Sequence, residues 1–423
     1  MGMALTEKIL SKACGRSVMP GEIVNVNVDK LMIVDMSGPI AFNLFEKIGT
    51  SKLYNSDMIV LVADHYGSGH DLKSANLIKK FRDYGNQYAI KEFFDQGRHG
   101  ICHQVMAENG LVLPNTVTVG TDSHATTYGA LGAFGCGVST SEAAVIMAIG
   151  KIWFRVPSSI KIELTGKLPF GCYGKDVALK IVSLLGCDET ALYKAVEITG
   201  EGVKSLDMDD RLALCNMIAE TGAKNCIIPA DEVTASYLGN KSSELYEIME
   251  SDQDAQYDLI YNINLDELVP YVAVPHMTSD VHPAAELEGT EINQAFLGSC
   301  TSGRLSEIAI AVKIFKGRKL PDKMVMRIVP SSQKIFLEAV KLGYIEILME
   351  AGITVESSSC ACCGGLHTGV LPDGAICIST TNRNFRGRMG SPDSFVYLAS
   401  AATVAASALE GRIVDPRKYL LRR

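Results

Sequence analysis

The sequence lacks the features that would place it in a membrane, in a secretory pathway or on nucleic acid. None of its apolar runs reaches the about 18–20 residues that a transmembrane helix needs, and the N-terminus has no apolar signal core. The net charge is −8 and no block of basic residues occurs, which argues against nucleic-acid binding. We therefore expect a cytoplasmic protein that does not span a membrane and that binds an anion through a local cluster of arginines.

Other absences limit which folds and which kinds of binding site are possible. The chain has no internal repeat and no low-complexity tract. The glycine-rich segment LGAFGCGVST at 131–140 has no lysine in the Walker position and no G-x-G-x-x-G, so it predicts close packing rather than a phosphate loop. Twelve cysteines in a chain without a secretion signal favour a reducing compartment over a disulfide framework.

The chain has 423 residues, of which 47% are hydrophobic, and this length predicts two or three domains. Short apolar runs alternate with helical stretches, which indicates an α/β fold with largely parallel sheets. We place boundaries near 158 and 288, giving domains 1–158, 159–288 and 289–423. Expected strands include 57–64, 116–122, 161–166, 295–299 and 324–330; expected helices include 141–154, 211–222, 333–352 and, as a buried helix, 395–409.

Reactive residues gather where the expected strands end. Asp64–His65 and Asp122–His124 each terminate one expected strand, and Cys300 follows another. Ligands of open parallel sheets bind beyond the carboxyl ends of the strands. Several reactive groups at such ends therefore predict one shared central cleft.

Three cysteines in two separated loops predict a metal cluster. Cys300 ends LGSC at 297–300, and Cys360 and Cys363 form a C-x-x-C in SSSCACCGG at 357–365. Three thiolates can hold three corners of an iron–sulfur cube and leave the fourth iron open to substrate, whereas electron-transfer clusters usually have four cysteine ligands. The alternative is a zinc site, but zinc needs four Cys or His ligands in two pairs and LGSC offers one. Cys362 is either a bystander, which we favour, or a fourth ligand.

Histidines beside carboxylates form a second group of candidates, namely Asp64, His65, His103, Asp122 and His124. A carboxylate can hold a neighbouring histidine protonated and oriented for proton transfer to a leaving hydroxyl. Each Asp–His pair alone is also typical of an ordinary surface pair or strand cap.

Two further sets of polar residues could bind substrate. Asn216 and Glu220 lie four residues apart on an expected helix and so share one face, which could equally be a solvated face. The segment TNRNFRGRMG at 381–390 holds Arg383, Arg386 and Arg388. Arginine matches carboxylates in a bidentate way, and the interleaved Asn and Gly favour a shaped anion pocket over a basic surface loop.

Together these segments resemble the aconitase family. The chain carries GTDSH at 120–124, GSCT at 298–301, the C-x-x-C with its following glycine, and NRNFRGR at 382–388, in the order found in that family. The resemblance covers nearly the whole chain and is greatest to the two-subunit 3-isopropylmalate dehydratase and homoaconitase branch. It implies three α/β domains around a cleft that holds a [4Fe-4S] cluster, with a separate small swivelling subunit that closes the site.

The resemblance also implies a hydro-lyase that dehydrates and rehydrates a substituted malate, in the leucine pathway for an isopropylmalate enzyme. It implies that the open iron acts as a Lewis acid, and that a serine of the small subunit removes the carbon-bound proton. The cluster ligands that it implies are Cys300, Cys360 and Cys363. The proton-handling residues that it implies are Asp64, His65, His103, Asp122, His124 and Glu220, and the cluster-side and substrate contacts are Asn216, Asn382, Arg383 and Arg388.

Four positions depart from the family pattern. Val34 stands where relatives carry His or Gln, Tyr128 replaces a common His, Ser302 replaces an Asn, and Cys362 replaces Pro or Ala. We expect Val34 and Tyr128 to affect substrate contacts. The candidate substrates are isopropylmalate, homocitrate or homoaconitate, and 2,3-dimethylmalate. An alternative from another class is a non-catalytic iron-sensing or RNA-binding relative.

Overall fold

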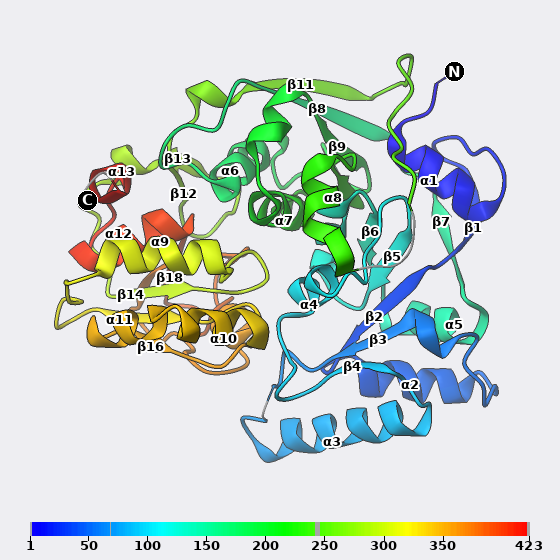
Figure 1. The fold of residues 1–423 in the computed structure, drawn as a ribbon, viewed down its shortest axis with the longest axis horizontal. Helices are drawn as coiled ribbons and strands as arrows, with labels where there is room; N and C mark the ends of the chain where they lie inside the picture. The colour runs from blue at the N-terminus through cyan, green and yellow to red at the C-terminus, as the bar shows by residue number, and fades with distance from the viewer. Residues whose placement is uncertain (1, 68, 242–245, 421–423) are drawn as a thin grey trace.

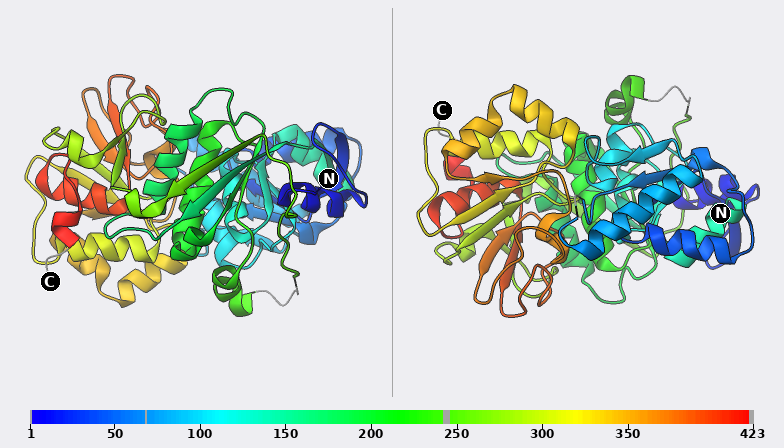
Figure 2. Two further views of the ribbon diagram at one scale, coloured as in Figure 1. Left: turned by 90° about the horizontal axis from the view of Figure 1, so that it is seen from above. Right: turned by 90° about the horizontal axis from the view of Figure 1, so that it is seen from below.

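The computed structural model describes residues 2–67, 69–241 and 246–420. Three sheets, each flanked by helices, form three regions of the molecule, and Figure 2 shows them in a row with the green middle region between the blue and the yellow-to-red ones. The strands of the three large sheets are mainly parallel. The predicted α/β class is therefore confirmed.

The first sheet has five parallel strands in the order β4-β3-β2-β5-β6. Buried, nearly continuous apolar runs form its central strands, as expected for a sheet that is covered on both faces. The strands are β2 Lys30–Val34, β3 Ile59–Val62, β4 Glu92–Phe94, β5 Val117–Gly120 and β6 Phe134–Gly137; the helices are α1 Leu5–Cys14, α2 Gly38–Lys47, α3 Leu72–Gln87, α4 Cys102–Glu108 and α5 Thr140–Ile149, with 3-10 turns at Ser56–Met58 and Ser123–Leu131. Beside it, β1 Ile23–Asn27 pairs antiparallel with β7 Lys151–Arg155.

The second sheet has four parallel strands in the order β10-β9-β8-β11. The strands are β8 Ser159–Thr165, β9 Ala195–Thr199, β10 Asn225–Ile227 and β11 Leu259–Asn264; the helices are α6 Gly174–Leu185, α7 Met208–Met217 and α8 Glu232–Leu238, with 3-10 turns at Glu201–Ser205, Ile218–Thr221, Gly239–Lys241 and Leu265–Glu267.

The third sheet has seven strands in the order β13-β12-β18-β17-β14-β15-β16, and only β12 pairs antiparallel with its neighbours. The strands are β12 Tyr271–Ala273, β13 Val281–Pro283, β14 Gln294–Leu297, β15 Val325–Ile328, β16 Thr354–Val355, β17 Ile376–Ser379 and β18 Phe395–Ala399; the helices are α9 Leu305–Phe315, α10 Gln333–Lys341, α11 Tyr344–Glu350, α12 Ala401–Glu410 and α13 Arg417–Leu420, with 3-10 turns at Ala284–Leu287 and Ala361–Gly364. Figure 1 shows this region at the left, with α9 to α12 around its strands.

Three expected helices were too long. The helix expected at 141–154 ends at Ile149, where Gly150 adopts a left-handed conformation (φ 68°) and the chain continues as β7. The helix expected at 333–352 breaks into α10 and α11 at Gly343 (φ 72°). The apolar run 395–409 is a strand followed by a helix, β18 and α12. Glycine tolerates the positive φ that ends a helix, and apolar composition alone does not separate a buried strand from a buried helix.

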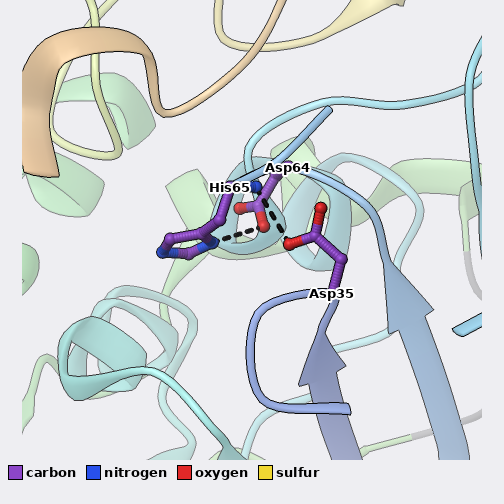
Figure 3. Close-up of side chains that lie close together, drawn as sticks. All are labelled: Asp35, Asp64 and His65. Atoms are coloured by element: carbon purple, nitrogen blue, oxygen red, sulfur yellow. Dashed lines mark hydrogen bonds and ion pairs between the residues drawn. The ribbon is translucent and has the colours of Figure 1, made fainter. Parts of the chain in front are cut away.

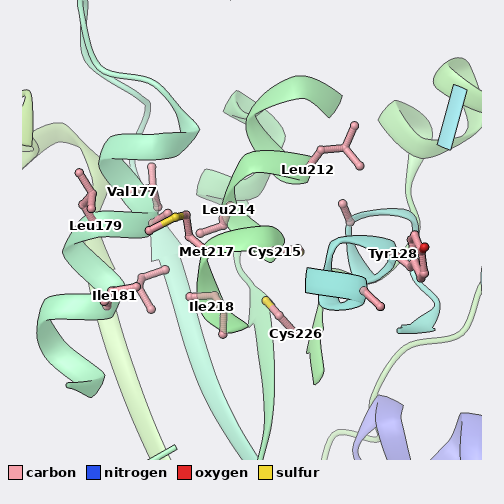
Figure 4. Packing of buried hydrophobic residues seen from close by; sticks show 14 of the residues in the cluster. Tyr128, Val177, Leu179, Ile181, Leu212, Leu214, Cys215, Met217, Ile218 and Cys226 are labelled. Carbon is pink, nitrogen blue, oxygen red and sulfur yellow. The ribbon is translucent and has the colours of Figure 1, made fainter. Parts of the chain in front are cut away.

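One hydrophobic cluster joins the three regions. It contains Tyr128 of the first region, Ile181 and Leu214 of the second, and Phe296 and Leu371 of the third. Figure 4 shows the part of this cluster where α6 and α7 pack beside the segment that carries Tyr128. The shared apolar contacts hold the carboxyl ends of the first and third sheets near each other, because burial of a large side chain stabilises by about 1.5–3 kcal/mol.

No helix among the described residues has the length and apolar character that crossing a bilayer requires. The domain limits near residues 158 and 288 stay predictions. Along the chain, the strands change sheet between Arg155 and Ser159, and again between Asn264 and Tyr271.

Candidate functional site

The predicted site residues come together around one cavity between the first and third regions. All of them line it except Asn216 and Glu220, which contact residues that do. The lining residues are Asp64, His65, Ile101, Cys102, His103, Asp122, Ser123, His124, Cys300, Cys360, Cys363, Asn382, Arg383 and Arg388. The expectation that reactive groups at strand ends share one cleft is therefore confirmed for the described structure.

Two asparagines contact two of the three predicted cluster cysteines. Cys300 follows β14, Cys360 directly precedes the 3-10 turn Ala361–Gly364 after β16, and Cys363 lies within that turn. Asn382 Nδ2 donates to Cys300 Sγ at 3.1 Å, and Asn382 Oδ1 accepts from Cys363 Sγ at 3.5 Å. Asn216 Oδ1 lies 3.7 Å from Cys300 Sγ. The asparagines therefore orient two sulfurs toward one space.

The spacing of these thiols bears on whether they could hold a cluster or a single metal ion. Tetrahedral zinc with sulfur ligands at about 2.3 Å requires the sulfurs to lie about 3.8 Å apart. Among the described residues, a set of three metal-ligand side chains with all ligand atoms within 4.8 Å occurs at Asp35, Asp64 and His65, and not at the three cysteines. Cys360 and Cys363 share a hydrogen bond, so the wider spacing that a cube requires concerns Cys300. The absence of a three-cysteine set from the described structure argues against one zinc ion held by all three thiols.

A network of neighbouring groups favours the thiolate of Cys363. The hydrogen bond from Cys360 lowers the pKa of Cys363 despite burial, and the guanidinium of Arg388 adds to the effect. Arg388 Nη2 lies 3.9 Å from Cys363 Sγ. Thiolates, not thiols, bind iron, so the surroundings of Cys363 suit a ligand.

Cys362 and Cys102 lie near the three predicted cluster cysteines but have different surroundings. Cys362 is buried in the hydrophobic cluster beside Cys377 and does not line the cavity. Cys102 does line the cavity, but burial, with the charges of Asp64 and Asp122, raises its pKa well above the usual value. Sequence patterns did not single out Cys102, since it precedes His103 outside any Cys motif. Both surroundings favour neutral thiols. Burial also raises the pKa of Cys300, and the hydrogen bond with Cys363 raises that of Cys360, so it is its position outside the cavity that separates Cys362 from the candidate ligands.

Asp122 is the centre of the histidine group. Its carboxylate lies 2.8 Å from His103 Nε2, 3.6 Å from His65 Nε2 and 3.5 Å from His124 Nδ1, and it also accepts from the backbone N–H of His124. Burial disfavours the carboxylate, but the hydrogen bonds from the three histidines outweigh it and hold the pKa of Asp122 well below its usual range. One charged carboxylate therefore orients three imidazoles.

Two aspartates at the ends of β2 and β3 hold His65 (Figure 3). Asp64 Oδ1 accepts from His65 Nδ1 at 2.7 Å, and Asp35 accepts from the backbone N–H groups of His65 and Tyr66 at 3.1 and 2.9 Å. Burial works against a charged imidazole, yet Asp64 and Asp122 raise the pKa of His65 well above its usual value. His65 is thus held as an imidazolium that can give up a proton. These contacts also satisfy Asp35, Asp64 and His65 without an ion.

Asp35 was not among the predicted residues, although it follows β2 directly. The strand-end rule that identified Asp64 and Asp122 would have identified it as well. Burial and the neighbouring Asp64 raise the pKa of Asp35 to about 6.

The three arginines of segment 381–390 differ in their contacts and in their burial. Arg383 Nε lies 2.8 and 3.0 Å from the two oxygens of Glu220, and Arg383 Nη2 donates to Ser123 Oγ. Glu220 also accepts from His124 Nε2 at 2.8 Å. Arg388 Nε is buried without a hydrogen-bond acceptor in the described structure, whereas Arg386 is exposed and does not line the cavity. Because Arg388 lines the cavity, this unpaired donor is available to an acceptor that enters the site.

Val34 and Tyr128 do not line the cavity. Val34 is fully buried and its N–H donates to Thr121 Oγ1. The hydroxyl of Tyr128 lies 3.3 Å from His103 Nδ1. In this structure Tyr128 supports His103 from behind, and the effect of either residue on substrate contacts stays a prediction.

Comparison with known proteins identifies the family. The model described as "Aconitase family (aconitate hydratase)" matches residues 7–411, so the chain belongs to the aconitase family. The chain is 46% identical to the 3-isopropylmalate dehydratase large subunit of Caldanaerobacter subterraneus subsp. tengcongensis over 99% of this chain and 100% of that one. It is 41% identical to 3-isopropylmalate dehydratase large subunit 1 of Methanopyrus kandleri, again over 99% and 100%.

A solved structure shares the fold at much lower identity. The holo-form of Thermococcus kodakaraensis aconitase X matches with a TM-score of 0.56 and 12% identity, over 96% of this chain and 95% of that one. At this identity the likeness concerns the fold alone.

Proposed function

We propose that the chain is the large subunit of a 3-isopropylmalate dehydratase, a hydro-lyase that removes water from a substituted malate and adds it back. Full-length identity of 41–46% to relatives with this name supports the proposal. The single observation that carries it is the shared cavity, which is lined by three thiols, by a histidine whose pKa is raised and by an arginine whose Nε is buried.

Cys300, Cys360 and Cys363 are the residues proposed to hold a [4Fe-4S] cluster. All three thiols line the cavity, Asn216 and Asn382 contact the sulfurs of Cys300 and Cys363, and Cys362 lies in the hydrophobic cluster instead. When bound, such a cluster with one iron free of protein ligands supplies a Lewis acid that weakens the bond between carbon and the leaving hydroxyl.

His65 is the proposed donor of the proton that the leaving hydroxyl needs. Its imidazolium is stabilised by Asp64 on one nitrogen and faces Asp122 with the other. His103 and His124 also contact Asp122, and these contacts hold its carboxylate in place when His65 loses its proton. General acid catalysis by a positioned histidine contributes typically about 10²–10⁴-fold in rate.

Arg388 and Arg383 are the proposed substrate carboxylate contacts. Arg388 has a free buried donor, while Arg383 is held by Glu220 and has its remaining donors toward Ser123. We propose that Arg388 binds one carboxylate directly. Arg383 contacts Glu220, which in turn holds His124. We propose that the second carboxylate binds on this side of the cavity.

We further propose that a small swivel-type subunit completes the site, as the name "large subunit" of the relatives suggests. Ser123 is the serine that lines the described cavity, and its hydroxyl lies between Arg383 Nη2 and His124 Nδ1 rather than facing the open side of the site alone. A residue of the partner would supply this base.

Anaerobic co-expression with the small subunit of a related enzyme tests the proposal. The purified complex, reconstituted with iron and sulfide, should dehydrate 3-isopropylmalate, and add water back to the alkene formed, faster than it acts on homocitrate or 2,3-dimethylmalate. Failure of every branched malate with an intact cluster would refute the hydro-lyase assignment, and preference for another acid would change the substrate. Tight, salt-sensitive binding of RNA in filter assays would favour the non-catalytic alternative.

A further inference from the structure

A buried lysine lies behind the cluster cysteines. Lys175 is at the start of α6, in the second region, and is 4% exposed. Its Nζ donates to the carbonyl oxygens of Thr381 at 2.7 Å and Thr380 at 3.2 Å, and lies 3.1 Å from Met217 Sδ. The lysine therefore joins α6, the end of α7 and a loop of the third region.

The residues that Lys175 contacts precede or follow the two asparagines of the site. Thr380 and Thr381 lead directly into Asn382, and Met217 directly follows Asn216. Asn382 contacts the sulfurs of Cys300 and Cys363, and Asn216 contacts Cys300. A shift of Lys175 would therefore move both asparagines that orient the thiols.

The ammonium group of Lys175 has no carboxylate partner within 4.0 Å among the described residues, in contrast to most buried charges. The nearby carboxylates are engaged elsewhere. Asp176 accepts from the backbone N–H groups of Tyr173 and Tyr271, and Glu307 accepts from Ser302 and from the backbone N–H of Arg304. Burial lowers the pKa of Lys175 to about 8, so the group stays charged at neutral pH.

The nearby groups whose negative charge acts on Lys175 are Cys300, Glu307, Cys363 and Glu220, with Cys300 first. Glu220 is already paired with His124 and Arg383. The hydrogen-bond partners of the ammonium are neutral. If Cys300 and Cys363 were bound to a cluster as thiolates, they would add negative charge on the side of the site that Lys175 supports.

We propose that Lys175 is the counter-charge and positioning residue of the cluster site: its ammonium fixes the two segments that carry Asn216 and Asn382 and offsets the negative charge of the ligated cysteines. This proposal rests on the proposed function, since it assumes that the cysteines hold a cluster. Lys175 touches neither substrate nor reacting atoms.

If the proposal is right, removing the positive charge of Lys175 should change the properties of the protein chiefly when the cluster is present. The net charge around an iron–sulfur cluster helps to set its reduction potential, and residues behind metal ligands typically change metal affinity about 10–100-fold. A purely structural lysine would instead affect the protein equally with and without the cluster.

The test uses Lys175→Met, Lys175→Gln and, as a matched control on the same helix, Lys180→Met. Lys180 is only partly buried and lies outside the site. Each full-length protein is purified without iron and then reconstituted anaerobically with iron and sulfide. Thermal melting of both forms, the midpoint potential of the cluster by electron paramagnetic resonance, and the rate of iron loss to a chelator are compared with the wild type.

We expect Lys175→Met and Lys175→Gln to melt near the wild type without the cluster. With the cluster, both should show a more negative midpoint potential and about tenfold faster iron loss, and Lys180→Met should match the wild type. A wild-type potential and iron-loss rate in both variants would overturn the proposal. So would equal destabilisation of the two forms, or failure of both variants to fold without iron. If the wild type takes up no cluster, it is the proposed function that fails.

Discussion

Among the twelve cysteines, position and surroundings separate three from their neighbours. Cys362 adjoins Cys363 in sequence but faces the hydrophobic cluster with Cys377. Cys102 lines the cavity from α4, outside the two cysteine loops, and burial, with the charges of Asp64 and Asp122, raises its pKa well above the usual value. Neither residue would be excluded as a ligand by the sequence, because thiol orientation and local charge depend on the folded chain.

Cys362→Ala and Cys102→Ala should therefore retain the cluster, whereas Cys363→Ala should lose it. Each alanine variant loses a buried sulfur and we expect about 1 kcal/mol of lost stability. Iron and sulfide analysis with absorption spectra of anaerobically reconstituted protein checks this. Loss of the cluster in Cys362→Ala, with the fold intact by circular dichroism, would make Cys362 a ligand.

Arg388 and Arg383 should respond differently to replacement by lysine. Arg388→Lys removes the buried Nε donor that lacks an acceptor, and we expect about 10–100-fold lower kcat/KM, mainly through a higher KM, because a charged hydrogen bond contributes about 1.5–3 kcal/mol. Arg383→Lys breaks the two contacts with Glu220 and should lower kcat as well. Arg386→Lys, at an exposed position, is the control. Equal kinetic parameters in Arg388→Lys and the wild type would contradict a carboxylate contact.

Asp35 should act on the reaction through the backbone of His65. Asp35→Ala leaves the N–H groups of His65 and Tyr66 without their acceptor, and each buried unsatisfied donor costs about 1–3 kcal/mol. We expect kcat to fall with little change in KM, since the substrate contacts remain. Asp35→Asn keeps one carbonyl oxygen and should be milder. Steady-state kinetics of both variants decide the matter, and a selective rise of KM would argue against this positioning role.

At the scale of elements, the sequence predicted the strands better than the helix ends. Apolar runs such as 59–62 and 117–120 are buried strands in the structure, and polar residues at their ends identified much of the site. Helix limits depended on Gly150 and Gly343, whose left-handed conformations end or separate helices. A glycine within an apolar pattern does not reveal this conformation, because packing on both sides selects it.

The starts of α6 and α7 carry carboxyls that make stability depend on pH. Burial raises the pKa of Asp210 to about 7, as it does for Asp176. In the unfolded chain these groups ionise near pH 4, so between about pH 4 and 7 the folded protein binds more protons. Their contribution to stability is therefore greatest at low pH, falls as pH rises through this window, and is constant above it.

Asp210→Asn keeps an oxygen that can accept from the N–H of Gly174 and removes the titration. We expect the fall in the free energy of unfolding between pH 5 and 7 to become smaller by on the order of 1 kcal/mol per pH unit. Urea unfolding of the cluster-free protein at several pH values measures it. Asp322→Asn, at an exposed turn, is the control, and an unchanged slope in Asp210→Asn would show that Asp210 ionises normally in the folded state.

At the scale of the whole molecule, the site is built from regions that the sequence alone does not bring together. The first sheet contributes Asp64 and Asp122, the third contributes the cysteines and Arg388, and the second contributes Asn216 and Glu220. Strand-end reasoning predicted a common cleft but gave no distances. Lys175 escaped notice because its role depends on contacts with Thr381, which lies 206 positions away along the chain.

Because the proposed cluster site draws on all three regions, loading it should stabilise the whole molecule. A ligand that binds the folded state alone adds about 3–4 kcal/mol when its concentration exceeds Kd by a hundred- to a thousandfold, so the reconstituted protein should melt a few degrees above the cluster-free form. The rise should appear in one cooperative transition, because the hydrophobic cluster spans the three regions. Differential scanning calorimetry under argon measures it, with Cys363→Ser as the control that gains nothing from added iron and sulfide. A second transition that shifts alone would instead mean that the cluster stabilises the third region by itself.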